Sequence, residues 1–127
     1  MPPVEIILAR QLASYLSVPI FVVDPDGDLL FYNEPAERII GTRFDETGKM
    51  AFEEWTTVFE PTDEDGVPIP ARDLPLAETL ETRQPALRSL FIRGLDGELR
   101  RITTVSVPLL AQGKRFVGGL AFFWEVK

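Results

Sequence analysis

Residues 63–108 read DEDGVPIPARDLPLAETLETRQPALRSLFIRGLDGELRRITTVSVP, and the order of residue types in this stretch indicates the fold. An acidic loop rich in proline and glycine leads into Leu74-Pro75. Proline there predicts the first turn of a helix, because that turn leaves N–H groups unpaired in any case. Two apolar-rich runs then flank residues 94–97, Gly-Leu-Asp-Gly, which predicts a β-hairpin. No catalytic constellation accompanies them, so we expect a binding or sensing protein and not an enzyme.

The sequence on either side adds helices and strands in the same order. An amphipathic helix is expected over residues 4–16, and β-branched and aromatic runs predict a hairpin over residues 20–32. Asn33 and Gly41 have the residue types that begin and end a helix. Short helical turns are expected over residues 42–59, a helix capped by Asp73 after them, and strands at 86–93, 98–107 and 116–126.

This order predicts an α+β fold, a five-stranded antiparallel sheet with short helices on one face and an N-terminal amphipathic helix. The 127 residues suit one domain over 18–127, preceded by a helical cap and dimerisation segment over 1–17.

The chain contains no cysteine and no histidine, which removes several classes of function. Disulfides, thiolate nucleophiles, the usual zinc ligand sets and serine-histidine triads all need one of these residues. The acidic segments 24–28 and 63–66 are expected to form turns, because the first has its glycine at the fourth position instead of the sixth that a calcium loop requires. We expect no metal site and no catalytic residues.

The net charge of −7 is divided unevenly along the chain. Residues 24–81 contain 16 acidic and 4 basic side chains, whereas residues 82–127 contain 3 acidic and 8 basic ones. The overall sign argues against nucleic-acid binding, and the arginines near the second hairpin are expected to be solvated edge charges. Residues 4–16 are too short to span a membrane and lack the features of a secretory signal, so a cytoplasmic location is expected.

Several short motifs give the chain a resemblance to PAS domains over nearly its whole length. They are Pro19, the DPDG turn at Asp24, Asn33-x-x-Ala36-Glu37 ending at Gly41, Asp65-Gly66 with Pro68 and Pro70, Leu74-Pro75-Leu76, Asp96-Gly97, Pro108-Leu109 and Gly118. The resemblance implies a sensory or interaction module, with a small-molecule cavity between a concave sheet and its helices. It implies no activity by itself, because one fold hosts many functions.

The resemblance also bears on cofactors. Light-sensing flavin relatives use a cysteine, and their flavin-contacting glutamine corresponds in our alignment to Leu120. Haem-binding relatives use a histidine on the helix that here covers residues 74–83. A flavin adduct and a histidine-ligated haem are therefore both excluded by composition, and a noncovalent flavin is not expected. We expect no cofactor.

Two function classes remain. The first is a sensor whose cavity binds a small apolar ligand, such as a fatty-acid-like compound. The second is a ligand-free interaction and dimerisation module, in which the same side chains fill the core. The expected cavity wall consists of apolar residues from most of the predicted elements: Phe21, Ile39, Ile40, Phe52, Trp55, Leu76, Leu80, Phe91, Val105, Leu120 and Phe122.

A homodimer is expected through the N-terminal helix and the outer sheet face, with Ile6, Leu8, Leu12, Phe123 and Trp124 at the interface. The alternative is a helix that only covers its own sheet. Because the sequence stops just after the last predicted strand, the expected effector is either a further domain of a longer protein or a separate signalling protein.

Overall fold

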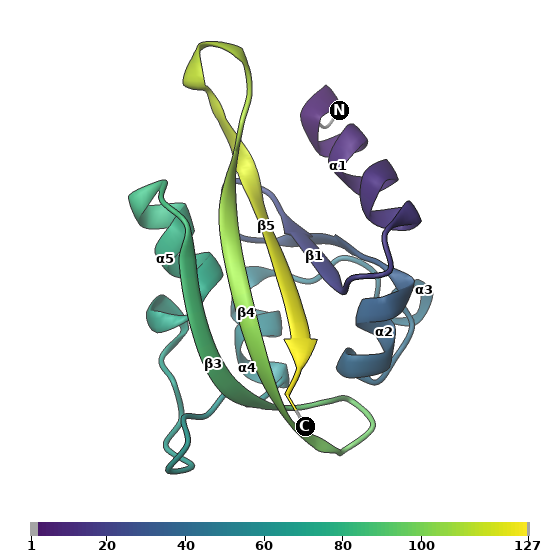
Figure 1. Ribbon diagram of the computed structural model, residues 1–127, viewed down its shortest axis with the longest axis vertical. Coiled ribbons are helices and arrows are strands. Elements are labelled where there is room, and N and C mark those ends of the chain that lie inside the picture. The colour runs from purple at the N-terminus through teal and green to yellow at the C-terminus, as the bar shows by residue number, and fades with distance from the viewer. Residues whose placement is uncertain (1–2, 127) are drawn as a thin grey trace.

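The computed structural model describes residues 3–126, which form a five-stranded antiparallel sheet with helices on both faces. The strands run in the order β2-β1-β5-β4-β3, so the first strand, β1, pairs with the last, β5, in the middle of the sheet (Figure 1). The predicted α+β fold and five-stranded sheet are thereby confirmed. The helices are α1 (Val4–Tyr15), α2 (Glu34–Ile40), α3 (Phe44–Thr47), α4 (Phe52–Val58) and α5 (Pro75–Thr82); the strands are β1 (Ile20–Val23), β2 (Leu29–Tyr32), β3 (Ala86–Arg93), β4 (Leu99–Leu110) and β5 (Phe116–Glu125).

Local sequence signals set several of these boundaries. The Asn33 side chain accepts a hydrogen bond from the Ala36 N–H at 3.2 Å, and α2 ends at Gly41, whose φ of 89° is left-handed. In the turn between β1 and β2, one carboxylate oxygen of Asp24 accepts from the N–H groups of Asp26 and Asp28. The acidic segment therefore forms a turn by using its carboxylate to satisfy backbone donors.

Several predicted boundaries differ from the structure by a residue or more, and the start of α5 and the end of β4 are the clearest cases. Leu74, and not Asp73, precedes α5, and no side chain caps that helix; Asp73 lies in a short 3₁₀ turn, Ala71–Asp73. Strand β4 continues three residues beyond the predicted end at Val107. It passes through Pro108 because β3 pairs no further along β4 than Ser106, which leaves only β5 as a neighbour there.

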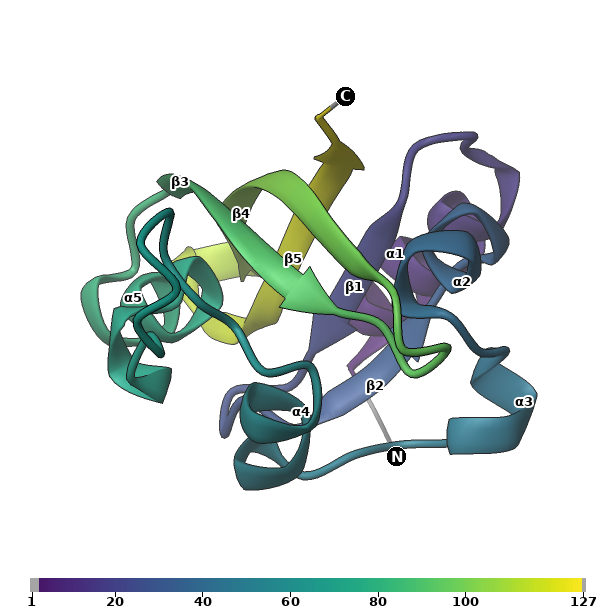
Figure 2. The same cartoon turned by 90° about the horizontal axis from the view of Figure 1, so that it is seen from below.

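Helices α2 to α5 and α1 cover opposite faces of the sheet. Helices α4 and α5 pack on the inner face and lie behind the sheet in Figure 1, whereas α1 packs on the outer face of β1 and β5 and stands to their right in that view; Figure 2 shows the same elements from below. The inner face carries the larger buried cluster, whereas a smaller one forms between α1 and the outer face of β1 and β5. Among residues 3–126, no helix has the length and apolar character needed to cross a membrane.

The periodicity of residues 4–16 predicts an apolar stripe on α1 made of Val4, Leu8, Leu12, Tyr15 and Leu16 with Ile7, and most of this stripe does not contact the sheet. The expected apolar stripe is exposed, with Leu8 at 56% and Leu12 at 59% of their full accessible surface. Ile6 and Ala13 are buried instead, and Ala9 and Leu16 pack beside them. Small residues let the helix lie close to the strands, whereas the leucines would hold it further away. The apolar stripe therefore covers no surface within the described chain.

One buried side chain joins α1 to the rest of the domain. Asn33 donates from Nδ2 to the carbonyl oxygens of Ala13 at 2.9 Å and Val18 at 2.8 Å. Its Oδ1 accepts from Ile20 N–H at 2.9 Å as well as from Ala36 N–H. Four hydrogen bonds thus connect the end of α1, the start of β1 and the start of α2 through a single amide.

Candidate functional site

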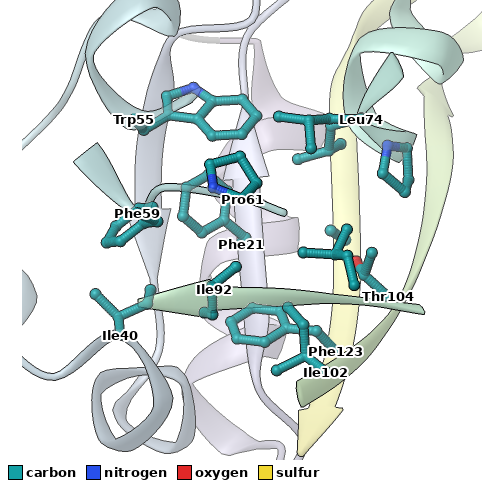
Figure 3. Close-up of a pocket in the computed structure, with 14 residues that line it drawn as sticks. Phe21, Ile40, Trp55, Phe59, Pro61, Leu74, Ile92, Ile102, Thr104 and Phe123 are labelled. Carbon is teal, nitrogen blue, oxygen red and sulfur yellow. The ribbon is translucent and has the colours of Figure 1, made fainter. Parts of the chain in front are cut away.

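An apolar cavity of about 90 Å³ lies between the inner sheet face and the helices. Figure 3 shows aromatic and aliphatic side chains around it, with the Thr104 oxygen as the polar atom from the sheet. Within residues 3–126 no side-chain hydrogen bond of Thr104 is found, although its neighbours in β4, Thr103 and Ser106, each form one, and its hydroxyl is not among the fully buried polar atoms without a partner. The lining residues are Phe21, Ile40, Trp55, Phe59, Pro61, Leu74, Pro75, Leu76, Leu90, Ile92, Ile102, Thr104, Ala121 and Phe123.

Aromatic packing fixes one wall of the cavity. The indole N–H of Trp55 donates to the carbonyl oxygen of Gly27 at 2.7 Å, which anchors α4 to the first hairpin. The Trp55 ring meets Phe21 edge to face at 5.1 Å between centroids, and Phe21 meets Phe123 at 6.5 Å. Edge-to-face rings at these separations attract one another beyond their burial alone. This wall is therefore rigid and sets the shape of the space.

The loop before α5 forms the other wall. Pro61 and Leu74 line the cavity from this loop, Pro75 lines it from the first turn of α5, and all three are buried. Thr62 and Phe91 exchange backbone hydrogen bonds at 2.9 Å in both directions, which ties the loop to the free edge of β3. Besides this bridge, the Arg93 N–H donates to the carbonyl oxygen of Phe59 at 2.7 Å, so a few backbone hydrogen bonds at an exposed edge attach this wall, and it can move at lower cost than the aromatic wall.

The structure brings together only part of the wall expected from the sequence. Phe21, Ile40, Trp55 and Leu76 line the cavity. Three other expected residues belong to the same core without lining the space, namely Ile39, Phe52 and Leu80.

The remaining four expected residues lie on the outer side of the sheet, so the prediction that they line the cavity is wrong. Strand neighbours point to opposite faces, and the cavity takes the alternate set, which contains Leu90, Ile92, Thr104, Ala121 and Phe123. The four displaced residues are Phe91, Val105, Leu120 and Phe122. A sequence signal existed in β4, where Thr103 and Ser89 pair on the outer face and Ile102 is buried.

The expected interface residues also separate into two groups. Leu8, Leu12 and Trp124 are exposed, as an interface requires. Ile6 is 4% exposed on the side of α1 that contacts the sheet, and Phe123 is 5% exposed on the inner face. Placing these two residues at the interface with a second molecule is therefore wrong, because each of them is buried within its own domain.

No titratable side chain lines the cavity. The perturbed groups lie elsewhere: burial raises the pKa of Tyr32, whose hydroxyl lies 3.0 Å from that of Thr47. At the turn between β3 and β4, hydrogen bonding from Arg100 lowers the pKa of Asp96 to about 2. The Arg100 guanidinium also donates to the carbonyl oxygen of Ile39, so this ion pair fastens the hairpin to α2. The pKa shifts of Tyr32 and Asp96 therefore arise from contacts that hold the fold together, away from the cavity.

Comparison with known proteins supports the fold. A family model described as the PAS fold matches residues 14–127. The chain therefore belongs to the PAS fold family, as the resemblance predicts. PAS domains typically have sensory and regulatory roles. A search of curated proteins finds no match.

Solved structures agree over almost the whole chain. The PAS domain of BvgS from Bordetella pertussis superimposes with a TM-score of 0.70 at 19% identity, covering 98% of this chain and 88% of that one. A Rhodobacter sphaeroides LOV protein gives 0.76 at 15% identity, covering 98% and 69%. The PAS domain of the fruit-fly ELK potassium channel gives 0.72 at 8% identity, covering 94% of each. At these identities the likeness establishes the fold alone.

The cavity differs in lining and in volume from what a flavin needs. Leu120 contributes to the cluster beneath α1, so the position expected to present an amide to a flavin is not on the cavity wall; Ala121 is. A volume of about 90 Å³ is far below the roughly 300–1,000 Å³ typical of ligand pockets. Within residues 3–126, no group of three or more histidine, cysteine, aspartate or glutamate residues is arranged to hold a metal ion. The described lining does not fit a flavin, and absorbance of purified protein would test the expectation of no cofactor.

Proposed function

We propose that this chain is a sensory domain in signal transduction that binds a small apolar ligand in its inner cavity. The observation that supports the proposal is an apolar space between the sheet and the helices, with the hydroxyl of Thr104 as a polar group on its wall. Apolar walls supply affinity through desolvation and dispersion, and one hydroxyl orients the ligand through a hydrogen bond. The proposed ligand is thus compact and apolar, with one polar group.

The volume limits the size of that ligand. An apolar cavity of about 150 Å³ holds a benzene molecule, and this one has about 90 Å³. A fatty-acid-like ligand would enter only after the wall that contains Pro61 and Leu74 moves away from the sheet. That wall is attached to β3 through the Thr62–Phe91 bridge. A larger ligand would therefore displace the loop further from the sheet.

The proposed output is a homodimer formed through α1. Leu8, Leu12 and Tyr15 leave a continuous apolar stripe on the side of α1 away from the sheet, and Trp124 is exposed on β5. A stripe of this kind is typical of a helix that packs against a partner. Occupancy of the cavity would change how two copies sit, and an effector domain or a separate signalling protein would read the change. A cytoplasmic location remains part of this proposal.

The alternative is a ligand-free module for interaction and dimerisation. The small cavity volume favours it, since side chains already fill most of the core. The exposed α1 stripe supports both versions, so dimerisation cannot distinguish them. Whether the cavity contains a ligand distinguishes the sensor from the ligand-free module.

Native mass spectrometry of gently purified protein, followed by solvent extraction, tests the proposal. A stoichiometric apolar compound is expected, and Thr104→Val should lower its occupancy while keeping the side-chain shape. Thr103→Val, on the outer face of the same strand, is the matched control and should retain the compound. Protein that carries no compound, and that takes up none from a library of small apolar molecules, would favour the ligand-free module.

A further inference from the structure

A second cleft lies on the outer side of the domain, between α1 and the first hairpin. Its volume is about 270 Å³, three times that of the inner cavity. Ile6, Val22, Leu30 and Phe31 supply an apolar floor. The cleft belongs neither to the cavity described above nor to the exposed stripe of α1, because Leu8 and Leu12 do not line it.

Two basic side chains line this cleft from separate parts of the chain. Arg10 comes from α1, and Lys49 comes from the segment between α3 and α4. Lys49 belongs to the strongly acidic part of the sequence, yet no carboxylate lines the cleft. Within residues 3–126, neither cation has a carboxylate oxygen within 4.0 Å, and neither donates a side-chain hydrogen bond.

Aromatic rings hold the arginine in place. The Arg10 guanidinium carbon lies 4.8 Å from the centroid of Phe31 and 5.8 Å from that of Phe44. The two rings meet edge to face at 5.4 Å. Stacking on an aromatic face uses the flat side of the guanidinium and leaves the N–H groups at its rim available for an acceptor.

We propose that this cleft binds a small carboxylate with an apolar body, such as an aromatic acid or a short acyl acid. The carboxylate would accept hydrogen bonds from Arg10 and Lys49, and the ring or chain would lie on the apolar floor. Guanidinium N–H groups match a carboxylate in geometry, and charge-assisted hydrogen bonds are the stronger kind. The volume, just below the roughly 300 Å³ lower bound of typical pockets, suits one ring system or a short chain.

Binding in this cleft would bridge α1 to the sheet. One wall is α1, through Arg10, Gln11 and Ser14, and the other is the first hairpin. Within the described chain α1 is also held by a small buried contact centred on Ile6 and Ala13, by the hydrogen bond from Asn33 and by an ion pair at 4.0 Å between Glu5 and Arg115, besides the contacts of Arg10 with the aromatic rings. A ligand that contacts both walls would therefore slow the separation of α1 from the sheet. The inference does not depend on the proposed function of the inner cavity.

The test is an NMR titration of the isotope-labelled full chain with 2-naphthoate, repeated with the neutral 2-naphthamide. Saturable shifts are expected for amides of residues 6–14, 22, 30–31 and 49, with about tenfold or greater preference for the acid. Slower hydrogen exchange in α1 should accompany saturation. Shifts centred on Thr104 and Ala121, equal affinity for the amide, or no saturable shift would each overturn the proposal.

A pair of charge-matched variants completes the test. Arg10→Gln with Lys49→Gln should weaken naphthoate binding about tenfold or more, whereas Arg72→Gln with Lys114→Gln removes the same charge from exposed sites outside the cleft and should leave it unchanged. Equal weakening by both pairs would show attraction to net charge alone and would contradict the site. Thr104→Val should leave naphthoate binding intact, which separates this inference from the proposed sensor function.

Discussion

The two faces of the sheet are built in different ways from the same strands. The inner face is closed by interlocking aromatic rings around a small cavity, with the Trp55 indole hydrogen-bonded to the first hairpin. The outer face is covered in part by α1, which approaches through Ile6 and Ala13 and leaves a larger cleft beside it. We therefore expect the inner face to contribute most of the free energy of unfolding. Contacts on the outer face should be replaceable with little change in that free energy.

The contrast is sharpest at two neighbouring residues of β5. Phe123 is 5% exposed on the inner face, and Trp124 is 44% exposed. Phe123→Ala should lower the free energy of unfolding by about 3–5 kcal/mol, because it leaves a cavity within a packed aromatic group. Trp124→Ala should lower it by less than about 1 kcal/mol. Urea denaturation of both variants measures the difference, and equal losses would refute the assignment of the faces.

The junction between the faces should show the next largest effect. Asn33→Ala removes four hydrogen bonds and leaves the carbonyl oxygens of Ala13 and Val18 without their partner. We expect a loss of about 2–4 kcal/mol in the free energy of unfolding, with faster hydrogen exchange in α1. Ser14→Ala, which removes an exposed hydrogen bond within α1, is the control and should change little. Unchanged exchange in α1 after Asn33→Ala would remove the proposed coupling.

The exposed stripe of α1 should influence association and not stability. Replacing Leu8 and Leu12 by aspartate should change the free energy of unfolding of the monomer by no more than about 0.5 kcal/mol, since both are exposed. If the proposed dimer forms through this stripe, sedimentation should show dimers for the unmodified protein and monomers for this variant. Val67→Asp, at another exposed apolar site, should leave the dimer intact. A dimer that persists after the double change would contradict an interface on this stripe.

The smallest effect concerns pH. The pKa of Asp96 is about 2 in the folded protein, against 3.8 for the ordinary carboxyl. A lowered folded pKa gives a stabilising contribution that is present above pH 3.8 and is lost as the pH falls towards 2. Asp96→Asn should therefore flatten the acid part of the stability curve in this window. Thermal unfolding at several acidic pH values measures it, and identical curves for both proteins would show that the ion pair with Arg100 contributes nothing.

The sequence predicted those parts of the fold that depend on local chemistry. Asn33, Gly41 and the turn at Asp24 each act on the backbone within a few residues, so their residue types were sufficient. The order of strands and helices could be predicted because such turn and cap residues separate one element from the next. The apolar character of the cavity could also be predicted, because the chain lacks the residues needed for most other sites.

The faces of the strands could not be predicted in the same way. All four residues of β1 are buried, and β5 is buried over five consecutive positions, because helices cover both sides of the sheet there. Without a polar side, alternation carries no information about direction, and a shift of one residue moves every side chain to the other face. Leu120 and Ala121 exchanged roles for this reason. The side of α1 that is buried could not be predicted from apolar periodicity. It contains Ile6, Ala9 and Ala13, and the two short alanine side chains allow a closer approach to the strands than leucines would.

The central claim is that the inner cavity is an accessible apolar site and not a filled core. A crystal structure of the unmodified protein under xenon pressure tests it most directly, since xenon enters dry apolar cavities. We predict xenon bound among Phe21, Thr104 and Ala121, inside the wall formed by Trp55 and Leu74. Closed packing of these side chains with no xenon between them would contradict the sensor function and leave the domain as an interaction module.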